Sequence, residues 1–100
     1  INDKEYAVSY IMSKKYGKQR IAYNLMQKGI ERETIEEAYF SIEEEYEKNI
    51  EDEKLEKAIE KNIKKEENKL IQYLVRQGFS LNRILSKYNE FKENNDLEGE

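Results

Sequence analysis

The sequence predicts an all-α protein built from two tandem three-helix repeats, arranged as an elongated right-to-left array of helices without a sheet. Three observations support this class. Proline is absent, so no helix interior has to kink. Apolar residues recur at helical spacing through most of the chain. Two segments 49 residues apart share one pattern. Because 37% of residues are apolar and 40% are charged, each helix must bury a narrow stripe.

The internal repeat is visible when two strings are aligned. IAYNLMQKGIERETIEEAYFSI begins at Ile21, and LIQYLVRQGFSLNRILSKYNEF begins at Leu70. Four pairs are identical: Leu25 and Leu74, Gly29 and Gly78, Ile35 and Ile84, Tyr39 and Tyr88. Chance agreement between two amphipathic helix pairs is the alternative. A glycine followed by a large apolar residue, in register with the stripes on both sides, argues against chance.

The first repeat is predicted over residues 1–50. A helix from Asp3 to Lys15, capped by Asn2 or Asp3, ends at Gly17. A second helix spans 18–28, and Gly29 provides its left-handed C-cap. A third helix spans 31–48. The stripes expected to face inward are Tyr6, Ala7, Tyr10 and Ile11, then Ile21 and Leu25 with Ala22 beside them, then Ile35, Ala38, Tyr39, Ile42 and Tyr46.

The second repeat is predicted over residues 51–93 and follows the same plan. Helices are expected over 53–65, with Asp52 as the cap, over 67–77, ended by Gly78, and from the cap Ser80 to about Lys92. The expected inward residues are Leu55, Ala58, Ile59, Ile63, Leu70, Tyr73, Leu74, Phe79, Ile84, Tyr88 and Phe91. Residues 94–100 are expected to form an acidic disordered tail.

Composition excludes several classes of function. Cysteine and histidine are both absent, which removes disulfides, zinc sites built on thiolates and the usual general base. No apolar run approaches the ~20 residues that cross a bilayer, and no secretory signal is visible. A cytoplasmic protein without cofactor or metal is therefore expected, and neither a membrane nor a small-molecule substrate is predicted as a partner. Because the chain starts at Ile1 and not at Met, we expect it to be a fragment.

Charge is segregated along the chain. Residues 1–28 carry a net charge of +4, residues 29–53 carry −9, residues 54–92 carry +5 and residues 93–100 carry −4. Such blocks suit a partner with its own charge pattern, although solvated helix faces explain any single block equally well. Tyr16 and Tyr23, close to basic residues in the first block, could form an aromatic-basic contact surface.

Three further motifs have simpler explanations. A helix, a glycine and a further helix also outline a helix-turn-helix, but Glu31, Glu33, Glu36 and Glu37 would repel phosphates in the first repeat. The second repeat, with Asn82, Arg83, Ser86 and Lys87, is more permissive. The glutamates at 43–45 and 47 point in different directions on a helix, so a solvated face explains them better than a cation site. No serine has a histidine to activate it, so an enzyme is not expected.

Two strings in this sequence resemble the RecX family. KKYGKQRIAYNLMQKGIERETIEEA, residues 14–38, resembles the repeat signature of that family: a basic segment, an Arg-Ile start to the second helix, Lys-Gly-Ile and a glutamate-rich third helix. LIQYLVRQGFSLNRI, residues 70–84, resembles the terminal repeat, where an Arg-x-Gly-Phe-Ser string is usual. The resemblance covers residues 3–91 and implies two repeats from the C-terminal end of such a protein.

The resemblance implies a regulator without catalytic residues. RecX proteins bind the RecA recombinase filament in its helical groove and suppress its recombinase and coprotease activities in DNA repair. The implied partner is therefore the RecA filament, with DNA inside the filament as a further contact. The candidate partner-binding residues are Lys14, Lys15, Lys18, Arg20, Lys28, Lys64, Lys65, Lys69, Arg76 and Arg83. A helical adaptor for another protein and a weak nucleic-acid binder remain the alternatives.

Overall fold

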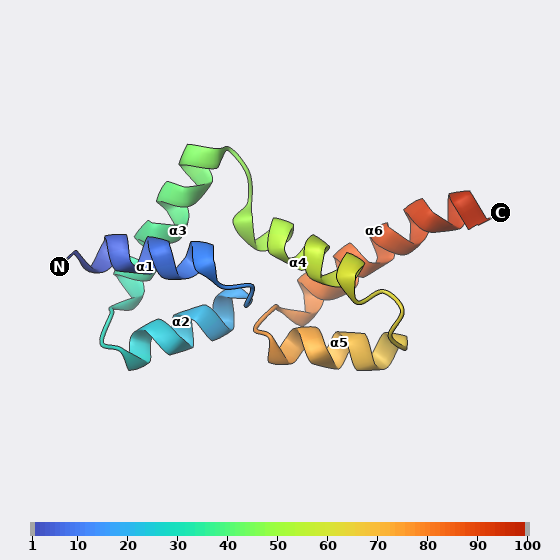
Figure 1. The fold of residues 1–100 in the computed structure, drawn as a ribbon, viewed down its shortest axis with the longest axis horizontal. Helices are drawn as coiled ribbons and strands as arrows, with labels where there is room; N and C mark the ends of the chain where they lie inside the picture. The colour runs from blue at the N-terminus through green and yellow to red at the C-terminus, as the bar shows by residue number, and fades with distance from the viewer. Residues whose placement is uncertain (1, 100) are drawn as a thin grey trace.

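The computed structural model describes residues 2–99, and the side chains of residues 2–95. Six helices and no strand occur in this part of the chain. They are α1 (Asp3–Ser13), α2 (Lys18–Gln27), α3 (Arg32–Tyr46), α4 (Ile50–Lys61), α5 (Glu67–Arg76) and α6 (Leu81–Gly99). The molecule is elongated, measuring 54 × 27 × 20 Å, with its two termini at opposite ends (Figure 1). The predicted all-α fold is confirmed.

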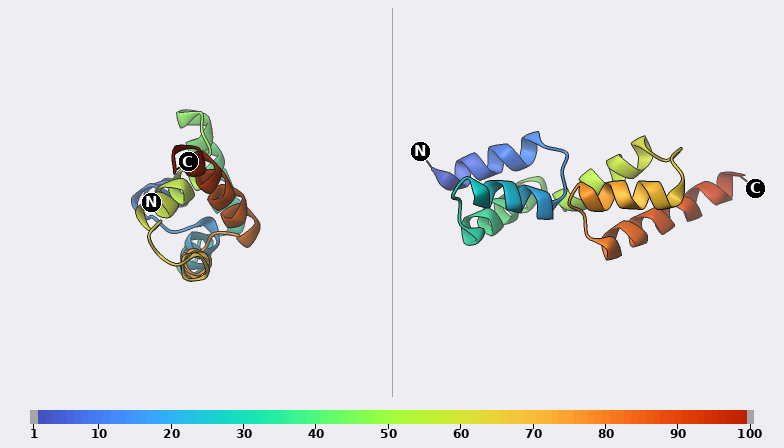
Figure 2. Two further views of the ribbon diagram at one scale, coloured as in Figure 1. Left: turned by 90° about the vertical axis from the view of Figure 1, so that its right-hand side faces the viewer. Right: turned by 90° about the horizontal axis from the view of Figure 1, so that it is seen from below.

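The helices form two three-helix repeats that lie end to end along the long axis (Figure 2). We call α1–α3 the first repeat and α4–α6 the second repeat. Helices α2 and α5, the middle helix of each repeat, lie along the same side of the molecule (Figures 1 and 2). None of the helices in residues 2–99 is long and apolar enough to cross a membrane.

Each repeat has its own hydrophobic core, built from the stripes that face inward. In the first repeat Ala7 and Ile11 of α1 pack with apolar residues of α2 and α3, and with Ile50 at the start of α4. In the second repeat Leu55 and Ile59 of α4 pack against α5 and α6. The fully buried residues of this second core include Leu55, Leu70, Leu74 and Ile84. Two small cores explain how a chain with few apolar residues stays folded.

The middle helix of each repeat ends in the same glycine motif. Gly29 and Gly78 have left-handed φ angles of 91° and 105°. The next N–H reaches back to the helix in both cases: Ile30 donates to the Leu25 carbonyl at 3.1 Å, and Phe79 donates to the Leu74 carbonyl at 3.1 Å. This six-to-one hydrogen bond defines a Schellman cap. The duplicated glycine cap that the sequence predicts is thus present in both repeats.

Several expectations differ from the structure. Helix α1 ends at Ser13, two residues before the expected end at Lys15, because the backbone of Lys14 is extended (φ −106°, ψ 150°). Helix α3 ends at Tyr46, because Glu47 adopts a left-handed conformation (φ 52°). Asn49 then caps α4 by accepting from the Asp52 N–H at 2.9 Å, so α4 begins earlier than expected and Asp52 is not its cap.

The expected disordered tail is also different, because α6 continues to Gly99. Between Leu81 and Gly99 the sequence has no glycine or proline that would end the helix. Glu100 lies outside the described residues. Tyr6 and Tyr46, expected to face inward, are 41% and 48% exposed. Tyr6 lies beside the Tyr10 ring, with 6.3 Å between the ring centroids, and Tyr46 is the last residue of α3.

Candidate functional site

The boundary between the repeats is formed by two loops in close contact. The backbone N–H of Gly17, in the α1–α2 loop, donates to the Gln77 carbonyl at 2.7 Å. The N–H of Gln19 donates to the Gly78 carbonyl at 3.1 Å. A β-carbon on Gly78 would lie 2.6 Å from the β-carbon of Arg20, which is too close for any side chain. Glycine is therefore required where the two repeats meet.

Helix α4 adds two polar contacts that hold the repeats together. The Glu51 carboxylate accepts the Lys18 N–H through both oxygens, at 3.0 and 2.8 Å, and so caps the N-terminus of α2. The Lys54 ammonium donates to the Ile11 carbonyl at 2.7 Å, near the C-terminus of α1. Both contacts suit the helix dipoles, with an anion at an N-terminus and a cation at a C-terminus. The second repeat therefore caps two helices of the first.

The two capping side chains are partly buried, and this changes their protonation. Burial raises the pKa of Glu51, against the opposing effect of the Lys18 backbone hydrogen bond. Burial lowers the pKa of Lys54 to about 8, although the Glu51 charge acts in the other direction. The side-chain amine of Lys54 therefore loses its proton at a lower pH than the amine of an exposed lysine.

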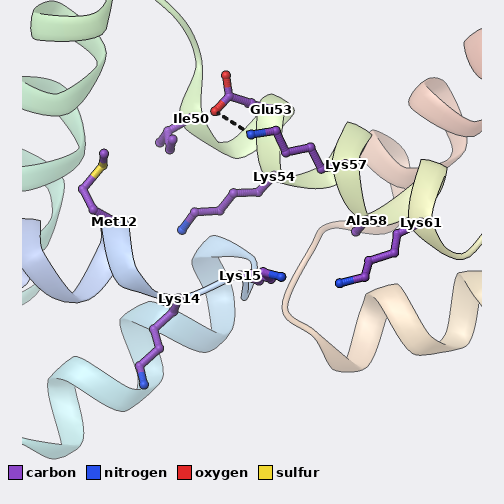
Figure 3. A pocket seen from close by; sticks show the side chains of 9 residues that line it. All are labelled: Met12, Lys14, Lys15, Ile50, Glu53, Lys54, Lys57, Ala58 and Lys61. Carbon is purple, nitrogen blue, oxygen red and sulfur yellow. Dashed lines mark ion pairs between the residues drawn. The ribbon is translucent and has the colours of Figure 1, made fainter.

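A basic cleft of about 400 Å³ lies beside these contacts, between the end of α1 and one face of α4. We call it the lysine cleft. Its lining residues are Met12, Lys14, Lys15, Ile50, Glu53, Lys54, Lys57, Ala58 and Lys61 (Figure 3). Five of the nine are lysines and one is acidic. The cleft therefore concentrates positive charge at the boundary between the repeats.

The lysines of the cleft have different local partners. Lys15 and Lys61 point toward one another across the cleft (Figure 3), and the proximity of Lys61 lowers the pKa of Lys15. Lys57 lies 3.7 Å from the Glu53 carboxylate. Lys14 points away, and its ammonium lies 5.4 Å from the centre of the Tyr10 ring. The cleft thus contains two like charges that face each other.

The structure separates the ten predicted partner-binding residues into groups. Lys14 and Lys15 line the lysine cleft. Lys18 and Arg83 line a second hollow at the same boundary, where Lys18 pairs with Glu36 at 2.8 Å and Arg83 pairs with Asp52. The remaining six do not gather with them. Arg20 lies over the Tyr16 ring at 3.8 Å, Lys65, Lys69 and Arg76 line a hollow on α5, and Lys28 and Lys64 are exposed.

Three residues of the lysine cleft are not among the predicted candidates: Lys54, Lys57 and Lys61. Their spacing of three and four residues places them on one face of a helix. This spacing can be read from the sequence, but it does not show which segment the lysine face of α4 contacts. In the structure that face contacts the end of α1 and the following loop, some forty residues earlier in the chain.

Comparison with known proteins identifies relatives across both repeats. A family profile described as "RecX, second three-helix domain" matches residues 2–38. A protein named Regulatory protein RecX from Yersinia enterocolitica is 36% identical over 99 residues, covering 93% of this chain and 59% of that protein. Proteins of the same name from Caldanaerobacter subterraneus subsp. tengcongensis and Clostridium botulinum are 35% and 34% identical, each covering 84% of this chain.

These matches cover 44% and 43% of the last two proteins, so the chain spans about half the length of the relatives it matches. No solved structure gives a significant match.

Proposed function

Because the chain belongs to the RecX family, we propose that it is a non-catalytic regulator that binds the RecA recombinase filament and inhibits its recombinase and coprotease activities. The observation that carries the proposal is the similarity to proteins named as regulators over 93% of the chain. That similarity includes both repeats, so the role does not depend on one local motif.

The shape and charge of the molecule suit such a partner. The two repeats form a rod 54 Å long and are joined by the contacts of Gly17, Glu51 and Lys54. Basic residues are distributed along this rod, in the lysine cleft and in the hollow on α5. An elongated molecule that makes several weak contacts with a repeating surface gains affinity by multivalency.

The hollow on α5 gives the sharpest test, because Lys69 and Arg76, two of its cations, are exposed and lie outside the lysine cleft. We expect the double variant Lys69→Glu/Arg76→Glu to bind the RecA filament more weakly, because reversed charges repel the surface that attracted them. Co-sedimentation with filaments and inhibition of strand exchange would measure the effect.

A matched control changes net charge equally at Lys4 and Lys92, two exposed basic residues outside the predicted set. The control variant Lys4→Glu/Lys92→Glu should bind filaments more tightly than the α5 variant. Equal losses in both would show that total charge alone acts. No binding of the unaltered chain to filaments would refute the proposed function.

A further inference from the structure

We propose that Lys15 is a site of covalent acylation by acyl phosphates, with Lys61 on the opposite wall of the lysine cleft holding the phosphate of the donor. The inference goes beyond the proposed function, because it assigns a chemical modification that needs no recombinase. It starts from the arrangement of the cleft, where the Lys15 amine of the first repeat faces the Lys61 amine of the second (Figure 3).

The Lys15 amine is accessible and has no carboxylate partner. Lys15 is an exposed residue of the α1–α2 loop. Within residues 2–95, neither Lys15 nor Lys61 forms an ion pair. Glu53 is the one acidic residue in the lining, and its carboxylate already lies 2.5 Å from the Lys48 ammonium and 3.7 Å from that of Lys57. A reagent therefore reaches the Lys15 nitrogen without displacing an ion pair.

The surroundings of Lys15 favour its reactive form. A lysine attacks a carbonyl carbon only as the neutral amine, and a neighbouring cation increases the fraction of that form. The charged groups around Lys15 are its neighbour Lys14 and, from α4, Glu53, Lys54, Lys57 and Lys61. The close approach of Lys61 lowers the pKa of Lys15, and the charge of Lys57 acts in the same direction. A larger fraction of Lys15 is therefore neutral near pH 7 than of a lysine without cationic neighbours.

Lys54 is the competing nucleophile in the cleft, because burial lowers its pKa to about 8. Its amine is already engaged, since it donates to the Ile11 carbonyl at 2.7 Å, and the side chain is half-buried. Attack by this nitrogen would break a hydrogen bond that joins the repeats and would bring the donor into a packed boundary. Lys15 combines a lowered pKa with exposure, so we expect the reaction at Lys15 first.

The donor must combine an anionic group with an activated carbonyl. Five of the nine lining residues are lysines, so the cleft attracts small anions of any kind. Among these anions, only one whose acyl carbon carries a good leaving group can react. In an acyl phosphate a single oxygen atom joins the reactive carbon to the phosphorus. A phosphate paired with Lys61 therefore brings the acyl carbon close to the nitrogen of Lys15 on the opposite wall.

The reaction is an acyl transfer that needs no further reagent. The lone pair of the Lys15 Nζ attacks the carbonyl carbon, and a C–N bond forms. The C–O bond to the phosphate breaks, and inorganic phosphate leaves with that electron pair. The proton released by the nitrogen goes to the departing phosphate or to solvent. The product is a neutral amide, so the modification removes one positive charge from the cleft and ends the repulsion between Lys15 and Lys61.

The test is incubation of the full chain with acetyl phosphate, followed by peptide mass spectrometry of each lysine. Lys15 should be acetylated several-fold faster than Lys28 and Lys64, which are exposed and lie outside the cleft. Lys61→Gln should lower the rate at Lys15 toward the rate of those two. Lys61→Arg should retain the rate, because a guanidinium keeps the positive charge. Lys4→Gln, with the same change in net charge as Lys61→Gln, should leave the rate at Lys15 unchanged.

An uncharged acyl donor, p-nitrophenyl acetate, separates the two contributions. Its rate depends on the neutral fraction and the access of each amine, and not on attraction of an anion. The preference for Lys15 over Lys28 should therefore be smaller with this ester than with acetyl phosphate. Urea unfolding checks the fold of each variant, and Lys61→Gln, which loses a repulsion and no ion pair, should be as stable as the unaltered chain or more stable.

Three results would overturn the inference: equal rates at Lys15, Lys28 and Lys64, a rate at Lys15 that Lys61→Gln does not lower, or an equal preference for Lys15 with both donors. The last result would show that the cleft does not hold the phosphate of the donor. All three measurements are made without filaments, so a failure of filament binding would leave them unaffected.

Discussion

Three glycines allow the cost of backbone conformation to be separated from the cost of close approach between the repeats. Gly29 and Gly78 both have left-handed φ angles in the same cap motif. A β-carbon at Gly29 would meet no heavy atom within 4 Å, whereas at Gly78 it would lie 2.6 Å from Arg20. The left-handed conformation costs an L-residue about 1–2 kcal/mol. Overpacking adds about 1–3 kcal/mol. We therefore expect Gly29→Ala to cost about 1–2 kcal/mol and Gly78→Ala about 2–5 kcal/mol.

The assay is equilibrium unfolding in urea, followed by far-ultraviolet circular dichroism. Gly17→Ala supplies the third comparison, because Gly17 has an ordinary φ of −73° but its added β-carbon would lie 2.6 Å from the Phe79 nitrogen. It should therefore lose stability through crowding alone. Equal losses for Gly29→Ala and Gly78→Ala would refute the reasoning, because the two loops would then not be in tight contact.

Further predictions concern α4 and its neighbours. Glu51→Ala should lower the free energy of unfolding by about 1–2 kcal/mol, because the α2 N-terminus loses its hydrogen-bond acceptor. Glu51→Gln should lower it less, since burial already disfavours the charged carboxylate. Equal losses of stability in thermal unfolding would contradict this. Asn49→Ala should lower the free energy of unfolding by about 1 kcal/mol, because Asn49 caps the N-terminus of α4. Asp52→Ala should lower it less, because Asp52 only pairs with Arg83. The midpoints of urea unfolding of the two variants measure the difference. The Lys54 pKa of about 8 lies below its ordinary 10.5, so the unfolded chain binds more protons between these values. The stability linked to this lowered pKa is fully present above pH 10.5 and is lost as the pH falls through about 8. The unfolding free energy of the unaltered chain should therefore rise relative to that of Lys54→Met between these two pH values. Parallel pH profiles for the two proteins would show that Lys54 is not buried.

The features that the sequence predicts well are those that depend on neighbours in the chain. Gly29 and Gly78 sit at the same place in two amphipathic patterns, and each closes a middle helix in the structure. Local spacing is enough for this, because a helix cap is decided within about one turn. The errors are also local. Glu47 ends α3 in a left-handed conformation that a non-glycine residue adopts infrequently, so its residue type does not indicate the helix end.

The candidate site could be predicted only in part, because its two sides come from different repeats. Lys14 and Lys15 are recognisable as basic residues beside a helix end, and they line the lysine cleft. Lys57 and Lys61 complete it, but their position depends on the angle between the repeats. That angle follows from the close approach of Gly17 and Gly78, which are 61 positions apart. Periodicity describes the face of one helix and does not say which second helix covers it.

Helix α4 explains why the boundary and the lysine cleft occur together. Leu55 and Ile59 point into the core of the second repeat, while Ile50, about one turn before Leu55, packs into the core of the first. The face turned toward the first repeat holds Glu51 and Lys54, three residues apart, which cap α2 and α1.

Lys61 lies two turns beyond Lys54 on nearly the same face, where the first repeat no longer covers the helix. The same register that joins the repeats therefore leaves a charged face open beside the joint.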